Sequence, residues 1–128
     1  MGRSVLIVDD SAAVRGYFAA ALRGAGFTVD EAANGYEALE KAYNGTYDLF
    51  LVDINMPKMT GYDFVRQLRS NESAFAPVVM ISTEAGAEDR EEAYKSGANA
   101  YLVKPVRAEV LLMLAKLLTG WEKESNAG

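Results

Sequence analysis

The chain has 128 residues, half of them hydrophobic and 24% charged, which is an ordinary composition for one globular domain. Its net charge is −5, which argues against nucleic-acid binding, and it contains neither Cys nor His. Disulfides, cysteine or histidine catalysis, and thiolate or imidazole metal sites are therefore excluded. The N-terminal apolar run of four residues is too short for a signal peptide or a membrane span, so we expect a cytoplasmic domain with no membrane insertion.

Five short apolar runs alternate with longer segments of helical pattern. The runs predict strands at Val5–Val8, Thr28–Ala32, Leu49–Val52, Val78–Ile81 and Ala100–Val103. Most of them lack apolar–polar alternation, as do strands of a parallel sheet that is covered on both faces. The run at Thr28–Ala32 mixes Thr, Asp and Glu with Val, so we place it at the edge of the sheet.

The intervening segments predict five helices, bounded by capping residues, glycines and prolines. They are expected at Ala12–Arg23, Tyr36–Tyr43, Tyr62–Arg69, Ala87–Ser96 and Ala108–Leu118. Five strands that alternate with five helices on right-handed crossovers indicate a doubly wound α/β fold with a five-stranded parallel sheet. In such a sheet ligands bind beyond the carboxyl ends of the strands.

Polar side chains follow four of the predicted strands at this end. They are Asp9-Asp10, Asp53, Ser82-Thr83 and Lys104. Each alone is more often a turn former, a helix cap or a solvated charge. Together they predict one pocket of three carboxylates, a hydroxyl and an ammonium.

Three neighbouring carboxylates repel one another, and Mg²⁺ is a natural counter-ion for them. A pocket that also holds a lysine and a hydroxyl suits a phosphoryl group. The chain contains neither G-x-x-x-x-G-K-[ST] nor G-x-G-x-x-G, so a cradled nucleotide is not expected. The residues instead favour a phosphoryl group attached covalently to a carboxylate.

The motifs DD, D-I-N-M-P-K-M-T-G, M-I-S-T-E-A and Y-L-V-K-P occur in this order. With them the chain resembles the receiver domain of bacterial two-component response regulators, and most of all the single-domain regulators of chemotaxis. The resemblance extends from about Ser4 to Leu118. It implies a flavodoxin-like strand order of 2-1-3-4-5. We place the receiver domain at residues 1–121 and, from the polar composition that follows Trp121, expect a flexible tail at 122–128.

The resemblance also implies roles for the pocket residues. Asp53 corresponds to the phosphoacceptor, which takes its phosphoryl group from a partner histidine kinase. Asp10, Asp53 and the Asn55 carbonyl correspond to the Mg²⁺ ligands, with Asp9 in support directly or through water. Lys104 corresponds to the residue that pairs with the acyl phosphate.

Further roles concern the response to phosphorylation. Ser82 corresponds to the switch hydroxyl, the Thr83 backbone to a phosphate contact and Tyr101 to the aromatic whose rotamer changes. Asn55 and Glu84 hold the positions that tune hydrolysis, in a pair that resembles the short-lived chemotaxis regulators. The chain departs from the family at Ser82 (usually Thr), at Thr83 (usually small) and at Val106 (often aromatic).

The last predicted helix is apolar on more than one face, so we expect an interaction surface there. One apolar line should pack on the sheet, and the second should be exposed. The second line comprises Val110, Met113, Leu114, Leu117 and Trp121. It predicts a downstream protein target or a homodimer on the face formed by the fourth helix, fifth strand and fifth helix. The alternative is that neighbouring segments shield it.

Other functions stay open at this point. A phosphorelay intermediate would have much the same sequence. A Mg²⁺-dependent phosphohydrolase with an aspartate nucleophile commonly needs an acidic residue two positions later, where this chain has Asn55. A flavin carrier would need a Gly- and hydroxyl-rich loop after the first strand. A receiver that never meets phosphate would act as a constitutive adaptor.

Overall fold

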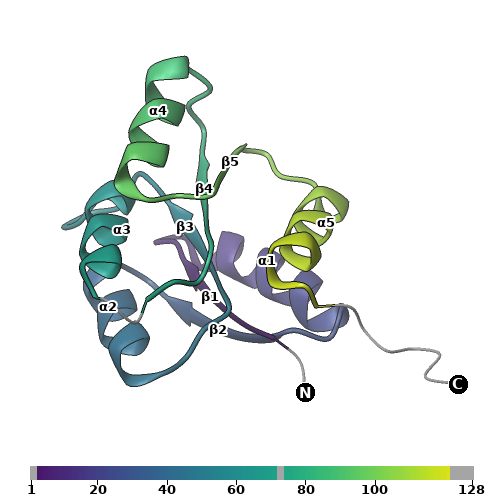
Figure 1. Ribbon diagram of the computed structural model, residues 1–128. Coiled ribbons are helices and arrows are strands. Elements are labelled where there is room, and N and C mark those ends of the chain that lie inside the picture. The colour runs from purple at the N-terminus through teal and green to yellow at the C-terminus, as the bar shows by residue number, and fades with distance from the viewer. Residues whose placement is uncertain (1–2, 72–73, 122–128) are drawn as a thin grey trace, which may run out of the picture.

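The computed structural model describes residues 3–71 and 74–121 and is a three-layer α/β sandwich (Figure 1). The strands are β1 (Ser4–Val8), β2 (Thr28–Ala32), β3 (Leu49–Asp53), β4 (Val78–Ser82) and β5 (Ala100–Val103). The helices are α1 (Ala12–Gly24), α2 (Gly35–Asn44), α3 (Gly61–Ser70), α4 (Ala87–Ser96) and α5 (Ala108–Thr119). The expected elements are all present; β2, β5 and α4 have the predicted bounds, and the other seven elements extend one residue further at one or both ends.

The strands form one parallel sheet in the order β2-β1-β3-β4-β5, as expected. The polar strand β2 lies at one edge, because only its β1 side is paired, in a register that sets Ile7 opposite Glu31. The central strand β3 pairs with both β1 and β4 and is buried along its whole length. This confirms the prediction that unalternated apolar runs mark strands covered on both faces.

The two faces of the sheet carry separate cores because alternate strand residues point in opposite directions. In β1, Val5 and Ile7 pack with Phe18 and Leu22 of α1 and with α5, whereas Leu6 and Val8 belong to the core beneath α2, α3 and α4. Figure 1 shows α1 and α5 on one side of the sheet and α2, α3 and α4 on the other.

Local signals fix the helix starts next to the strand ends. The side chains of Ser11, Asn34 and Thr60 each accept a hydrogen bond from the amide three residues later, in α1, α2 and α3 respectively. Helix α4 ends at Gly97, whose φ of 118° lies in the left-handed region that glycine tolerates.

Strands β3 and β4 each continue one residue beyond the predicted end, so Asp53 and Ser82 are the last residues of their strands. The predicted tail at 122–128 lies outside the described residues. No helix in the described part of the chain is long and apolar enough to cross a membrane.

Candidate functional site

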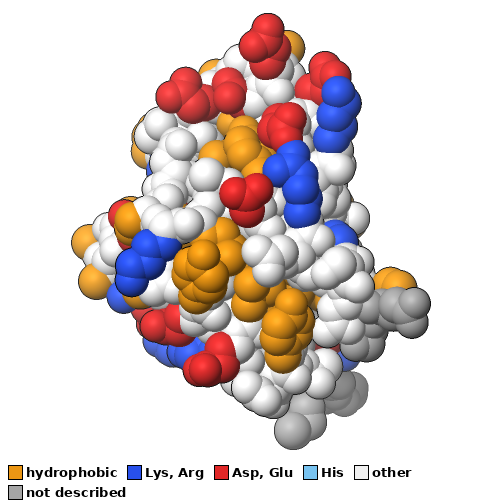
Figure 2. Space-filling model, turned by 90° about the vertical axis from the view of Figure 1, so that its left-hand side faces the viewer, with side chains coloured by type: hydrophobic (Ala, Val, Ile, Leu, Met, Phe, Trp, Pro, Cys, Tyr) orange, Lys and Arg blue, Asp and Glu red, His pale blue; other side chains and the backbone are white. Residues whose placement is uncertain are grey.

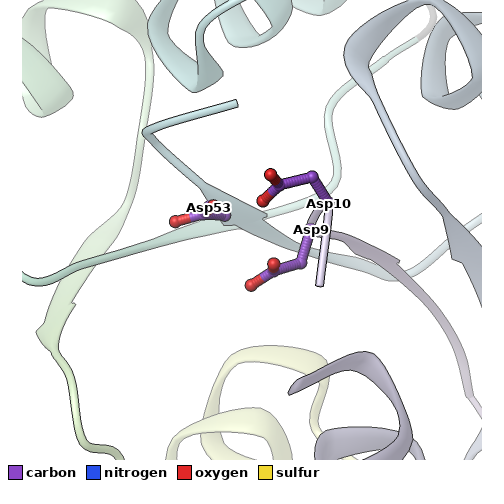
Figure 3. Close-up of side chains that lie close together, drawn as sticks. All are labelled: Asp9, Asp10 and Asp53. Atoms are coloured by element: carbon purple, nitrogen blue, oxygen red, sulfur yellow. The ribbon is translucent and has the colours of Figure 1, made fainter. Parts of the chain in front are cut away.

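Three carboxylates meet at the carboxyl end of the sheet. Asp9 and Asp10 follow β1 and Asp53 ends β3, and one oxygen from each carboxylate lies within 4.8 Å of the others. Figure 3 shows that the side chains of Asp9 and Asp10 extend from the end of β1 toward the side where Asp53 lies. Asp9 and Asp53 are only 2% and 6% exposed, whereas Asp10 faces solvent. The adjacency of β1 and β3 produces this cluster from residues that are 43 or 44 positions apart in sequence.

Lys104, which follows β5, is the cation of the pocket. Its Nζ lies 3.2 Å from Asp9 Oδ2 and 3.2 Å from Asp53 Oδ1. One ammonium thus bridges two buried carboxylates, and Asp10 adds a third negative charge at the mouth. The pocket therefore keeps an excess of negative charge.

The electrostatics of the pocket act most strongly on Asp53. Burial, together with the negative charge of Asp9, raises the pKa of Asp53 from 3.8 to about 6, although Lys104 opposes the change. Burial lowers the pKa of Lys104, but the charges of Asp53 and Asp9 outweigh it, so that pKa is raised overall. Lys104 is thus protonated at neutral pH. The charged form of Asp53 is destabilised by its surroundings.

The atoms of Asp9 are largely engaged by the protein itself. Its Oδ1 accepts a hydrogen bond from the Ser11 amide at 2.9 Å, and its Oδ2 accepts from Lys104. Its main-chain oxygen accepts a 2.7 Å hydrogen bond from Arg15 Nη1. By contrast, the exposed Asp10 carboxylate makes no hydrogen bond or ion pair with the part of the chain that the structure describes.

The donor set of this pocket fits Mg²⁺. Carboxylate oxygens from three residues face a common space, and hard divalent cations prefer oxygen ligands. The excess negative charge favours a cation, and the unengaged Asp10 and the destabilised Asp53 are the carboxylates best able to accept one.

A second group of residues links β4 to β5 beside the pocket. Ser82 is fully buried, and its Oγ accepts a 3.0 Å hydrogen bond from the Glu84 amide. The Tyr101 hydroxyl donates to the Glu84 carbonyl at 2.8 Å, which holds the ring inward. The guanidinium of Arg90, from α4, lies 5.0 Å from the centre of the Tyr101 ring.

The sequence singled out neither Arg15 nor Arg90 for this site, and no local motif marks them. A third missed residue is Gly61, where an added Cβ would lie 2.5 Å from the main-chain oxygen of Asp53. In the sequence, the pair Thr60-Gly61 indicates only the start of a helix. The remaining predicted residues are Asn55 and Thr83, which closely follow Asp53 and Ser82 in sequence and are exposed. Their roles stay predictions.

The expected apolar line on α5 is exposed only in part. Val110, Met113 and Leu117 are exposed, the last by 75%. Leu114 and Trp121, in contrast, are half-buried and pack against the core beneath α1 and α5, so predicting them as exposed was wrong. Leu114 lies about 60° around the helix from the buried Leu111, which brings it to the edge of the sheet-facing stripe.

Trp121 is turned inward by a different contact. Its ring meets that of Phe27 edge-on, with centroids 6.5 Å apart. Phe27 precedes β2, so a segment distant in sequence covers this end of the helix. The helical spacing alone could not reveal that cover.

Acidic side chains dominate the exposed surface of α4. Figure 2 shows acidic side chains gathered at the top of the molecule, where α4 lies. Two of them are paired with cations, since Arg66 of α3 contacts Glu92 and Lys95 contacts Glu91. This is mostly a solvated face, and the Arg66–Glu92 pair links α4 to α3.

The model of the family described as response regulator receiver domain matches residues 5–116. The chain belongs to this family. A gliding motility regulatory protein of Myxococcus xanthus is 42% identical to the receiver over 117 residues, which are 90% of this chain and 15% of that protein. The chemotaxis protein CheY of Pseudomonas aeruginosa is 41% identical over 109 residues, which are 84% of this chain and 88% of that protein.

Solved structures agree with this assignment. Chemotaxis protein CheY4 of Vibrio cholerae superposes with a TM-score of 0.89 at 39% identity, over 92% of the receiver and 99% of that chain. The receiver domain of a sensor histidine kinase from Pseudomonas aeruginosa has a TM-score of 0.87 at 30% identity, over 94% of this chain and all of that one. That structure holds a magnesium ion coordinated in its active-site cleft.

Proposed function

We propose that this receiver accepts a phosphoryl group on Asp53 and in response changes which proteins it binds. By its resemblance to the family, the donor is a phosphohistidine on a histidine kinase, and that kinase is a separate protein because this chain has no histidine. A carboxylate oxygen of Asp53 attacks phosphorus, the phosphorus–nitrogen bond of the donor breaks, and the imidazole leaves with the bonding electrons. The product is an acyl phosphate on Asp53.

Different residues of the pocket would bind the metal ion and the phosphoryl group. Asp10, Asp53 and the Asn55 carbonyl would hold Mg²⁺, with Asp9 supporting the site through water. When bound, Mg²⁺ neutralises charge on the phosphoryl oxygens and aligns them with the attacking carboxylate. Lys104 leaves its bridge between Asp9 and Asp53 to pair with the new phosphate, and it already lies 3.2 Å from the nucleophile side chain.

The hydroxyl of Ser82 and the backbone amide of Thr83 would donate hydrogen bonds to a phosphoryl oxygen. Ser82 Oγ accepts from the Glu84 amide, so its own hydrogen is available to donate. A shift of Ser82 would move Glu84 and with it the hydrogen bond from Tyr101. We assign the switch to Ser82 and Tyr101, and the tuning of hydrolysis to Asn55 and Glu84.

The readout is a protein–protein contact on the α4-β5-α5 face. Its exposed apolar residues are Val110, Met113 and Leu117, which suit a downstream target or a second copy of the chain. Similarity to chemotaxis regulators favours chemotaxis-type signalling in the bacterial cytoplasm, over a phosphorelay intermediate. We place the domain at residues 1–121, with the tail at 122–128, and we class the chain as a phosphoacceptor that catalyses only its own phosphotransfer and dephosphorylation.

The observation that carries this proposal is the cluster of three carboxylates bridged by Lys104. The test is labelling by a small phosphodonor such as acetyl phosphate, with the phosphoform separated on a phosphate-affinity gel. Wild-type protein should be labelled in MgCl₂ and not in EDTA, and Asp53→Asn should not be labelled at all. The exposed Asp63→Asn is the matched control and should be labelled normally. Full labelling of Asp53→Asn, or labelling in EDTA, would refute the assignment.

A further inference from the structure

Arg15 of α1 contacts the pocket through the backbone rather than through a carboxylate. Its Nη1 donates a 2.7 Å hydrogen bond to the main-chain oxygen of Asp9, and its Nε lies 3.1 Å from Glu31 Oε1. The side chain is only 17% exposed. The guanidinium is therefore fixed at two of its nitrogens, in a geometry that a lysine cannot reproduce.

The oxygen that Arg15 binds belongs to the peptide bond between Asp9 and Asp10. A peptide unit is planar, so anchoring its oxygen fixes the orientation of the amide that leads into Asp10. This matters because the Asp10 side chain has no hydrogen bond or ion pair within the described residues. The direction in which its carboxylate points thus depends on the backbone that carries it.

Glu31 completes the arrangement from the neighbouring strand. It lies in β2 opposite Ile7 of β1, two residues before the anchored peptide oxygen of Asp9. The next residue, Ala32, accepts a 3.1 Å hydrogen bond from the Asp9 amide. The end of β1 is thus held by β2 through both the main chain and the Arg15–Glu31 pair.

We propose that Arg15 is a positioning residue for the divalent-cation site: by clamping the Asp9–Asp10 peptide it aims the Asp10 carboxylate at the space shared with Asp53. This rests on the proposed function, because it concerns the Mg²⁺ site described there. Arg15 touches neither the cation nor the reacting atoms.

The charge of Arg15 and its clamping act in opposite directions on cation binding. Removing a positive charge near an anionic pocket should tighten Mg²⁺ binding by electrostatics alone. Releasing the peptide that aims a ligand should weaken it, and the loss of a group that orients a metal ligand typically costs about tenfold or more in affinity. The sign of the change therefore separates the two roles.

Helix α1 also supplies a matched control. Arg23 Nη2 donates a 3.0 Å hydrogen bond to the main-chain oxygen of Val29 in β2, which is the same kind of contact toward the other end of the helix. Arg23 is exposed, so its loss should affect stability less than the loss of Arg15 does, and it should leave the pocket unchanged.

The experiment measures the Mg²⁺ dissociation constant by isothermal titration calorimetry and thermal unfolding in EDTA. We expect Arg15→Met to weaken Mg²⁺ binding about tenfold and Arg15→Lys, which keeps the charge, to weaken it several-fold. Arg23→Met should bind Mg²⁺ like the wild type even where its unfolding temperature falls. If Arg15→Met does not fold, Arg15→Lys decides the matter.

Wild-type affinity in Arg15→Lys, or tighter binding in Arg15→Met, would show that only the charge matters and would overturn the inference. Equal weakening in Arg23→Met would also overturn it, because the effect would then follow general stability. If the wild-type chain binds no Mg²⁺, the result would refute the proposed metal site itself, and with it the role of Arg15.

Discussion

The Tyr101 hydroxyl donates its hydrogen bond to the carbonyl of Glu84, 2.8 Å away, and the amide of the same residue donates to Ser82 Oγ at 3.0 Å. One residue's backbone thus joins the buried hydroxyl at the pocket to the aromatic ring of β5. In the proposed mechanism, a displacement of Ser82 toward a phosphoryl group would move the acceptor that holds Tyr101. This provides a physical link between the pocket and the α4-β5-α5 face.

Arg90 should stabilise the inward position of the Tyr101 ring, because its guanidinium lies 5.0 Å from the ring centroid. Such a contact contributes about 0.5–1 kcal/mol, which corresponds to about a two- to fivefold change in rotamer populations. We expect Arg90→Gln to increase the outward population by this factor. Fluorine NMR of fluorotyrosine-labelled protein would measure it, with Tyr101→Phe assigning the resonance. Lys95→Gln, on the same helix, is the control, and an unchanged Tyr101 resonance in Arg90→Gln would contradict the prediction.

Asp53→Asn should stabilise the protein in EDTA at neutral pH. Burial and the charge of Asp9 raise the pKa of Asp53 from 3.8 to about 6, so between these values the folded state binds more protons than the unfolded state. The contribution of Asp53 to the stability of the wild type therefore falls as pH rises from about 4 to 6 and stays lower above that range. The full shift corresponds to at most about 3 kcal/mol, which solvent screening at the open pocket reduces to about 1–2 kcal/mol.

Urea unfolding of wild type and Asp53→Asn at a series of pH values would measure this effect. We expect a gap of about 1–2 kcal/mol at pH 7.5 that closes toward pH 4. The exposed Glu40→Gln is the control and should leave the curve unchanged. A gap that widens as pH falls would have the wrong sign and would count against a destabilised carboxylate at Asp53.

Lys104→Met should destabilise the protein in EDTA and make its stability depend on Mg²⁺. The change leaves Asp9 and Asp53 buried without their cation, at a cost of about 2 kcal/mol once Asp53 takes up a proton. Removing the ammonium also removes the cation that competes with Mg²⁺ for Asp9 and Asp53, so MgCl₂ should raise the unfolding temperature of the variant more than that of the wild type. Differential scanning calorimetry with and without MgCl₂ measures both. Lys95→Met, in an exposed pair, should change neither, and equal Mg²⁺ responses in all three proteins would refute the prediction.

Much of the pocket could be predicted from the sequence because its side chains directly follow strands. In a parallel sheet the carboxyl ends of all strands lie at one edge, so Asp9, Asp10, Asp53, Ser82 and Lys104 had to converge once the runs were identified as strands. The strand order itself came from family resemblance, since the alternation of strands and helices does not determine it.

Contacts made across the packed elements could not be predicted in this way. Arg15 reaches Asp9 and Arg90 reaches Tyr101 only because α1 and α4 pack at particular angles on the sheet. Trp121 is covered by Phe27, from a loop far away in sequence. Helical periodicity gives the direction of a side chain around its own helix but not the segments that meet it.

Leu117→Glu should weaken binding to a target or a second copy without unfolding the domain. Leu117 is 75% exposed, so a charge there has little effect on the core, unlike one at the half-buried Leu114. Sedimentation of beryllofluoride-treated and untreated protein would detect a dimer, and a pull-down under the same conditions would detect a target. We expect Leu117→Glu to lower either association at least tenfold, while the exposed Tyr43→Glu on α2 does not. Unchanged association in Leu117→Glu would remove α5 from the interface.

Gly61→Ala should destabilise the domain even though alanine favours helices. An added Cβ would lie 2.5 Å from the Asp53 main-chain oxygen and 2.9 Å from Ile54 Cα, so the start of α3 would have to move away from the end of β3. The Gly61 amide, which donates to the Ile54 carbonyl at 2.8 Å, would move with it. Such overpacking against backbone costs about 2–3 kcal/mol.

Gly16→Ala is the matched comparison, because Gly16 lies within α1 with nothing within 4 Å of the added Cβ. It should stabilise the domain by about 0.5–1 kcal/mol through helix propensity and reduced freedom of the unfolded chain. Urea unfolding would measure both variants. Because the start of α3 meets the backbone of Asp53, Gly61→Ala should also slow labelling by acetyl phosphate, whereas Gly16→Ala should not. If the two variants change stability in the same direction, close packing at Gly61 does not hold the end of β3 in place.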